Sequence, residues 1–332
     1  MVAGLTVLDP GVLSLVQDAG RYGVGQLGLS QGGPVDCHAF AWANYLLDNP
    51  ANTPLIEITM GQARFRADHG ISIAITGADI QPCINGQRVG MWQTLTLNAG
   101  DELSLSYARR GLRAYLAVRG GWAVDGAFGS AATVMRNQLG GLHSGLGEQV
   151  GGLPLAKGDW LACRPHALLP RVRGVPTRFI PDYDALTPLA LLPGYQFDSF
   201  SSAALTTFFE GEYTVDQHSD RMGVRLNGPS VMSKQPGIVS EGIALGAVQV
   251  PPDGQPIVLL NDRQTLGGYP KLGCLTRASL SMLAQTRPGK IVRFYPAKLT
   301  DASAQWQAFV QFFDWIESVK TLIDEPLGDR GS

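Results

Sequence analysis

The chain has 332 residues, of which 45% are hydrophobic and 16% are charged, and its formal net charge is -2. This composition excludes a disordered chain and, at about 150 residues per domain, predicts two globular domains. The charge is near neutral and the sequence has no Lys/Arg cluster, so we expect no nucleic-acid partner. No apolar run approaches the ~20 residues that span a bilayer, and no basic leader segment is seen. We therefore predict a cytoplasmic protein without a membrane partner.

Most of the predicted elements are short β-strands. Apolar runs rich in β-branched residues occupy 71–75, 95–97, 103–105 and 257–260, and turn formers such as Asn85-Gly86 follow them. Such runs bounded by turn residues are typical of strands. The chain is therefore expected to be mainly β.

Two segments instead have a helical period. Residues 35–48 place apolar side chains on one stripe from Phe40 to Leu47, and Asp36 stands where a helix begins, so we predict a helix there. A second helix is predicted in the tail from apolar residues at helical spacing, namely Trp306, Phe309, Val310, Phe313, Ile316 and Val319. We expect this helix to dock on its own domain; the alternative is an interface with a partner.

The two halves of the chain resemble each other. Four identities recur at the same spacing, since Gln17, Arg21, Gly23 and Val24 correspond to Gln217, Arg221, Gly223 and Val224. A repeat of two long units favours two tandem β-barrels over a solenoid. With a proline-rich connector at 165–188, we predict a first domain at 1–168, a second at 169–298, and a C-terminal helix and tail at 299–332.

The spacing of cysteines and histidines predicts no metal site. The four cysteines are dispersed without a C-x-x-C pair, and the five histidines show no i, i+4 pairing. We interpret the cysteines as reduced, core-filling thiols. His218 is the one histidine kept as a site candidate, because Asp220 and Arg221 lie beside it.

The segment from Ser240 to Pro270 is the densest in residues that can carry chemistry. It combines glycines, mixed charges and an aromatic residue directly after an apolar run, where rigid elements often present a site. Arg263 suits a carboxylate or phosphate, and Asp262 or Glu241 suits proton transfer, so these three are the candidate catalytic residues. The candidate substrate-binding residues are Asp220, Arg221, His218, Gln249, Gln264, Gly267, Gly268 and Tyr269.

Two alternatives stay open for these residues. From spacing alone, a structural ion pair of Asp262 with Arg263 and a tight turn at Gly267-Gly268 are favoured over a site, and the family resemblance given below reverses that order. In the first half, Gln17, Arg21 and Glu57 are candidate contributors to the site, but an arginine repeated in both halves is equally expected to brace a loop. The sequence contains neither a P-loop nor a G-x-S-x-G motif.

Several segments resemble a known family. They are 16–23, 55–59, 113–121, 219–223 and the long run 240–270. The chain is identified through them as similar to the family of allophanate hydrolase subunit 2, which includes the C subunit of 5-oxoprolinase, the Kip antagonist and part of the carboxyltransferase region of urea carboxylase. The resemblance implies two cyclophilin-like β-barrel domains, in agreement with the internal duplication.

The resemblance also implies an activity and partners. It implies the C subunit of an ATP-dependent 5-oxoprolinase that opens the 5-oxoproline lactam to L-glutamate. This subunit would be inactive alone. Its partners would be a subunit 1 protein, similar to the B subunit of that enzyme, and an A subunit. ATP with magnesium would serve the complex. The alternatives are a regulatory binding protein like the Kip antagonist, or part of a biotin-dependent carboxyltransferase; because the chain lacks Met-Lys-Met, covalent biotin would be carried by another chain.

Overall fold

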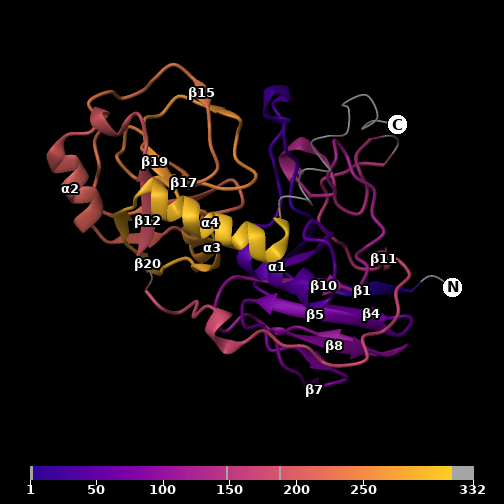
Figure 1. Cartoon of the computed structure of the whole chain (residues 1–332). Helices are drawn as coiled ribbons and strands as arrows, with labels where there is room; N and C mark the ends of the chain where they lie inside the picture. The colour runs from indigo at the N-terminus through magenta and orange to yellow at the C-terminus, as the bar shows by residue number, and fades with distance from the viewer. Residues whose placement is uncertain (1–2, 147–148, 187, 316–332) are drawn as a thin grey trace. The chain divides into compact units, whose positions relative to one another are not determined.

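The computed structural model describes residues 3–146, 149–186 and 188–315. The chain divides into two compact units (Figure 1). Unit 1 takes the described residues of Met1–Gly23, Gly32–Tyr183 and Val310–Ser332, and unit 2 takes Val24–Gln31 and Asp184–Phe309. These bounds differ from the predicted ones at three places. Residues 169–183 stay with the first half, while 24–31 and the end of the chain each join the unit of the other half.

Unit 1 contains two antiparallel sheets. One has the order β11 (Trp160–Ala162), β1 (Gly4–Pro10), β4 (Ala63–Ala67), β9 (Glu102–Ser104), β6 (Cys83–Ile84) and β7 (Gln87–Arg88). The other has the order β2 (Leu13–Gln17), β3 (Leu55–Thr59), β10 (Arg113–Val118), β5 (Ile71–Gly77) and β8 (Gln93–Leu97). Side chains from both sheets form one hydrophobic core that includes Val7, Ile56, Phe65, Ile73 and Trp122.

The predicted first helix is α1 (Cys37–Leu46). Its N-cap is Asp36, whose side chain accepts a hydrogen bond from the backbone N–H of Ala39 at 3.1 Å. The helix packs on β5 and β10, and this covers the second face of that sheet. Both strands are consequently buried along their whole length, whereas β4 alternates between buried and exposed side chains.

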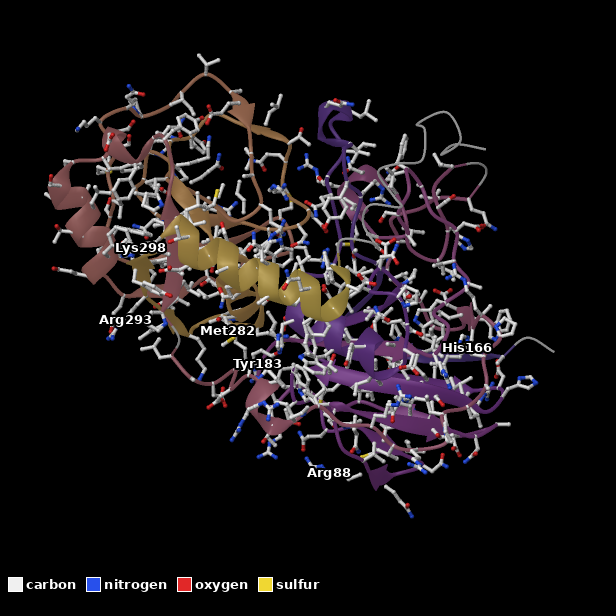
Figure 2. All side chains as sticks on the ribbon, in the orientation of Figure 1. Arg88, His166, Tyr183, Met282, Arg293 and Lys298 are labelled. Carbon is white, nitrogen blue, oxygen red and sulfur yellow. The ribbon has the colours of Figure 1, made fainter. Side chains whose placement is uncertain are left out.

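Unit 2 is built on an eight-stranded sheet. Its order is β20 (Ile291–Val292), β13 (Tyr213–Val215), β14 (Gly223–Asn227), β17 (Ile257–Leu259), β16 (Ala247–Gln249), β19 (Lys271–Leu275), β12 (Leu189–Pro193) and β21 (Phe294–Pro296). Arg293, labelled in Figure 2, is the single residue between the two edge strands β20 and β21, so the sheet forms a nearly closed barrel. A separate ladder joins β15 (Glu241–Gly242) to β18 (Leu266–Gly267). The prediction of a mainly β protein with tandem barrel domains is confirmed.

Two helices of unit 2 were not predicted. They are α2 (Ser202–Glu210) and α3 (Arg277–Gln285), capped by the side chains of Ser201 and Thr276. Each has only nine residues, so its apolar period is too short to stand out in the sequence. The short 3-10 helices are Gly25–Leu27, Met135–Asn137, Thr177–Phe179 and Phe197–Ser199.

The predicted tail helix is α4 (Leu299–Phe313). Arg277 lies over the ring of Trp306 in unit 2, and in unit 1 Phe313 packs against Trp42 and Tyr45. The helix was expected to dock on its own domain, but its residues are divided between unit 2, up to Phe309, and unit 1, from Val310. Ile316 and Val319 lie outside the described residues. Within those residues, no helix combines the length and the apolar character needed to cross a membrane.

Candidate functional site

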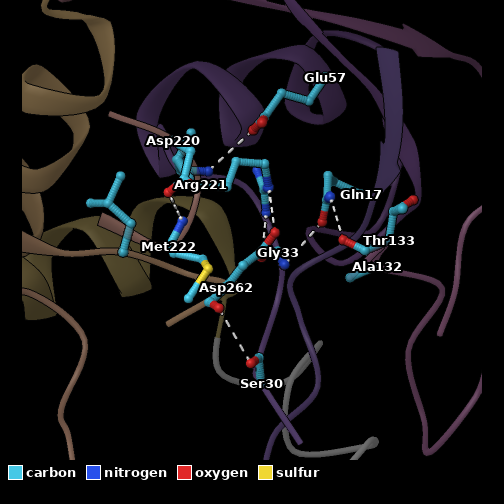
Figure 3. Close-up of polar contacts among 12 residues, drawn as sticks. Gln17, Ser30, Gly33, Glu57, Ala132, Thr133, Asp220, Arg221, Met222 and Asp262 are labelled. Carbon is cyan, nitrogen blue, oxygen red and sulfur yellow. Dashed lines mark hydrogen bonds and ion pairs between the residues drawn. The ribbon is translucent and has the colours of Figure 1, made fainter. Parts of the chain in front are cut away.

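The central polar contact of unit 2 is a buried ion pair between Arg221 and Asp262. Nε and Nη2 of Arg221 donate to Oδ2 and Oδ1 of Asp262 at 2.9 and 3.0 Å, and the two residues are 3% and 4% exposed (Figure 3). Arg221 precedes β14 and Asp262 follows β17, so the antiparallel pairing of these strands brings the two side chains together. Both carboxylate oxygens are engaged in this bidentate contact, which is the strongest geometry for such a pair.

The surrounding loops are fastened to the same pair. Asp220 accepts hydrogen bonds from the backbone N–H groups of Met222 and Gly223, which shapes the turn before β14. Ser30 donates to the carbonyl oxygen of Asp262 at 3.4 Å (Figure 3). It also donates to the carbonyl oxygen of Arg263 at 2.8 Å. This contact explains why the segment 24–31 belongs to unit 2.

Arg263 points to backbone carbonyls and not to its neighbour Asp262. Its Nε donates to the Ile243 carbonyl at 3.0 Å and its Nη1 to the Leu260 carbonyl at 3.2 Å. Burial, followed by the nearby charge of Arg277, lowers the pKa of Arg263 to about 10. The structural ion pair considered for Asp262 thus exists, but its partner is Arg221.

A second polar group, which we call the Glu241 cluster, consists of Tyr195, Gln196, Glu241, Gln249 and Lys271. Lys271 forms an ion pair with Glu241, whose Oε1 also accepts from Nε2 of Gln196 at 3.1 Å. The amide oxygen of Gln196 accepts from the backbone N–H of Lys271 at 2.9 Å. The Lys271 ammonium, and then the Tyr195 hydroxyl, hold the pKa of Glu241 below its ordinary value. Glu241 is therefore a fixed carboxylate and a weak proton acceptor.

Gln249 and Lys271 lie directly opposite each other on β16 and β19. Opposite residues of an antiparallel pair project from the same face of the sheet. Both are buried, at 2% and 8% exposed, and the amide nitrogen of Gln249 has no hydrogen-bond partner among the described residues. An amide buried without a partner costs about 1–3 kcal/mol, so its retention here needs a reason beyond stability.

Gly267 makes room for the Gln249 amide. It pairs with Glu241 in the β15–β18 ladder, and a Cβ atom at this position would lie 2.8 Å from Nε2 of Gln249 and 2.5 Å from Cδ1 of Ile243. Any larger residue would displace one of these side chains. Among the other predicted residues, Gln264 is half-buried, Tyr269 is exposed, and the Gly268 carbonyl accepts from the N–H of Ile238 at 2.8 Å.

Sequence reasoning missed Tyr195, Gln196 and Lys271. Lys271 follows directly after the segment 240–270 and is the first residue of β19, so a slightly longer window would have included it. Tyr195 and Gln196 lie about 45 residues earlier in the chain than Glu241, and only the folded barrel brings them to it. His218 is placed apart from the Glu241 cluster, since its Nδ1 contacts Asp216 in a different pocket.

The three first-half candidates are bonded within unit 1. Arg21 donates to the carbonyl oxygens of Ala127, Ser130 and Ala132 at 2.8–3.0 Å, which is the expected loop bracing. Nε2 of Gln17 donates to the Thr133 carbonyl at 3.0 Å, and its Oε1 accepts from the N–H of Gly33 at 2.9 Å (Figure 3).

Glu57 is buried as well, at 1% exposed. Its Oε2 accepts from the N–H of Val35 at 3.2 Å and from the Tyr115 hydroxyl at 2.9 Å. Burial, and then the charge of Glu57, raise the pKa of Tyr115 well above its ordinary value. Glu57 and Tyr115 thus connect β3 and β10 to the start of α1, which is a structural task.

The chain matches a family model and is similar to named proteins over nearly its whole length. Residues 27–296 match the family model described as carboxyltransferase domain, subdomain A and B. The C subunit of 5-oxoprolinase from Escherichia coli (strain K12) is 33% identical over 311 residues, covering 93% of this chain and 96% of the relative. The protein of the same name from Haemophilus influenzae is 32% identical and covers 97% of this chain and 99% of the relative.

Solved structures show the same fold inside longer chains. The crystal structure of Kluyveromyces lactis urea carboxylase matches with a TM-score of 0.84 and 26% identity, over 94% of this chain and 29% of that chain. The crystal structure of TTHA0988 matches with a TM-score of 0.78 and 34% identity, over 89% of this chain and 55% of that chain. This chain therefore spans about half, or less, of these solved relatives.

Proposed function

The chain belongs to the carboxyltransferase subdomain A and B family, and we propose that it is the C subunit of an ATP-dependent 5-oxoprolinase, which opens the 5-oxoproline lactam to L-glutamate. The observation that carries this proposal is the match to two proteins named as C subunits of 5-oxoprolinase, over more than nine-tenths of both this chain and each relative. Such a name marks one part of a larger enzyme, and we propose that proteins corresponding to its A and B subunits complete it.

Within that complex we assign substrate binding to the Glu241 cluster. A lactam carbonyl is a weak electrophile, and fixed donors that face its oxygen stabilise the negative charge that develops during hydrolysis. The Lys271 ammonium and the Gln249 amide are such donors, and they project from one face of β16 and β19. Glu241 holds the ammonium in position through their ion pair. The two-residue β15–β18 ladder beside them is short enough to move when substrate enters.

The N-termini of α1, α2 and α3 are capped by side chains of this chain. Helix N-termini often bind phosphate through unpaired N–H groups. Here the side chains of Asp36, Ser201 and Thr276 each accept from one such N–H group, at the N-termini of α1, α2 and α3 respectively. We therefore propose that a partner protein of the complex binds the nucleotide.

Reconstitution tests the function. The chain would be mixed with purified candidate A and B subunits, and glutamate formed from 5-oxoproline and ATP would be measured. We expect turnover in the full mixture and none with this chain alone. A complete mixture that forms no glutamate would overturn the proposed function.

The same assay tests the assigned residues. Lys271→Met removes the buried ammonium, and Lys290→Met removes an exposed lysine of the same unit as the matched control. We expect Lys271→Met to lower kcat/KM at least tenfold, corresponding to about 1.4 kcal/mol, and Lys290→Met to be near wild type. Equal turnover in both variants would remove Lys271 from the site and leave the function standing.

A second function is favoured by the urea carboxylase structure, which this chain matches over 94% of its length. In that case the chain would be one part of a biotin-dependent carboxyltransferase, with biotin carried by another chain. Transfer of the carboxyl group from an added carboxylated biotin carrier to urea, measured in the same protein mixture without 5-oxoproline, would support this alternative over lactam opening.

A further inference from the structure

A polar pocket of unit 2 is separate from the Glu241 cluster. It has a volume of about 490 Å³ and lies over the outer face of β14 and the loop 253–257. Its polar lining consists of Asp216, His218, Arg225, Asn227, Asp253 and Gln255. The proposed function uses none of these side chains.

One wall of the pocket is a carboxylate that fixes an imidazole ring. Oδ1 of Asp216 accepts from the backbone N–H of His218 and contacts its Nδ1, both at 2.8 Å. Oδ2 of Asp216 accepts from Nδ2 of Asn227 at 2.6 Å. With both oxygens engaged, Asp216 holds the ring by Nδ1, and Nε2 of His218 remains available to a ligand, because the side chain is 73% exposed.

The other wall presents a guanidinium group. Arg225 and Asn227 alternate with buried residues on β14, so both side chains project from the outer face of the barrel. Hydroxyl and backbone contacts from Ser219 and Asp216 fix the backbone of Arg225. Its side chain has no ion pair or hydrogen bond among the described residues.

We propose that this pocket binds a small anion, whose phosphate or carboxylate oxygens accept hydrogen bonds from the Arg225 guanidinium and from Nε2 of His218. An arginine fork matches the spacing of two such oxygens, and Nε2 of His218 lies on the opposite wall of the same pocket.

The side chains of the pocket that are not already hydrogen-bonded within the chain favour an anion as the ligand. The oxygens of Asp216 are engaged, one oxygen of Asp253 accepts from the N–H of Gln255, and the Gln255 amide is bonded twice to the backbone of Gly228. The groups that remain are mainly donors, led by Arg225. The charged groups lining the pocket besides His218 are Asp216, Asp253 and Arg225, so two carboxylates oppose a bound anion and the Arg225 guanidinium attracts it.

Nuclear magnetic resonance of the histidine rings provides the test, because the full chain has only five histidines. Inorganic phosphate and, separately, acetate would be titrated at about pH 6, near the ordinary pKa of histidine. We expect saturable shifts of the His218 ring signals. Tighter binding of phosphate than of acetate would indicate a phosphorylated ligand. Acetate binding that is as tight as phosphate binding, or tighter, would indicate a carboxylic acid.

Two variants decide whether the site is specific. Arg225→Gln should weaken binding at least tenfold, while Arg66→Gln, which removes an outward-facing arginine from β4, should leave it unchanged. The proposal is overturned if neither anion saturates, or if both variants bind alike. The latter result would indicate an adventitious ion only.

Discussion

At the scale of single residues, buried polar side chains in unit 2 have two distinct tasks. Arg221 and Asp262 form a bidentate ion pair that engages both carboxylate oxygens, which accounts for their burial. Gln249 and Lys271 are equally buried, but the Gln249 amide nitrogen lacks a partner among the described residues and Lys271 has only one carboxylate. The first pair therefore holds loops together, and the second pair contains the donors to which the proposed function assigns substrate binding.

The pair of Arg221 and Asp262 predicts a loss of stability on mutation. Asp262→Ala leaves the Arg221 guanidinium buried without its carboxylate, and removing one partner of a buried pair costs roughly 3–5 kcal/mol. We expect a decrease of that size in the free energy of unfolding, measured by urea denaturation. Asp253→Ala, at an exposed aspartate of the same unit, is the control and should change it by about 0.5 kcal/mol or less. Equal stability of the two variants would contradict a structural role.

Gly267 predicts a steric effect. Gly267→Ala places a methyl group against the Gln249 amide and Ile243, and overpacking of this kind costs about 1–3 kcal/mol. Gly242→Ala, in the neighbouring strand of the same ladder, meets no atom within 4 Å and is the matched control. We expect only Gly267→Ala to lower both the free energy of unfolding and turnover in the reconstituted complex. Identical behaviour of the two variants would show that the ladder adapts freely.

At the scale of elements, the aromatic residues of α4 and α1 show which helices a sequence reveals. Both helices bear long apolar stripes that pack on a domain, and both were predicted. Phe312 and Phe313 are adjacent but differ in burial, since Phe312 is 48% exposed and Phe313 is 8% exposed. Their ring centroids lie 5.4 and 5.3 Å from that of Trp42.

This difference in burial predicts unequal effects of truncation. Phe313→Ala removes a buried ring from contact with Trp42 and Tyr45, which costs about 3–5 kcal/mol. Phe312→Ala should cost clearly less because half of its surface already faces solvent. Thermal unfolding of both variants checks the order. A larger loss of thermal stability for Phe312→Ala than for Phe313→Ala would contradict the position of α4 in the structure.

At the scale of the whole molecule, each compact unit takes a segment from the other half of the sequence. Residues 24–31 belong to unit 2 through contacts such as those of Ser30, and residues from Val310 belong to unit 1. The internal duplication therefore does not correspond to two chain segments that can be separated by one cut.

Truncation tests this interdependence. A fragment of residues 1–183 keeps the sheets of unit 1 but loses Phe313 and Trp315, which pack on Trp42 and Phe40. We expect this fragment to bind a hydrophobic dye and to unfold at a lower temperature than the full chain, because the aromatic face of α1 is uncovered. A fragment with the thermal stability of the full chain would show that unit 1 is complete without its C-terminal segment.

Local patterns were enough to predict the β-rich class, the helix at α1, the tail helix and the doubled architecture. Each depends on periodicity or repetition within a short stretch of chain, and such signals survive without knowledge of distant contacts. The segment resemblance likewise identified the family, which the match over residues 27–296 confirms. The roles of the predicted site residues stay predictions.

Tertiary structure alone decided which charges meet. Asp262 is adjacent in sequence to Arg263 but pairs with Arg221, because the pairing of β14 with β17 aligns the ends of two strands about 40 residues apart. Strand pairing likewise brings Lys271 to Glu241. His218 lies three residues from Arg221 in the sequence, but it lines a pocket that does not include Arg221. Adjacent residues on a strand or turn point in different directions, so sequence proximity locates a segment, whereas strand pairing selects the partner of each side chain.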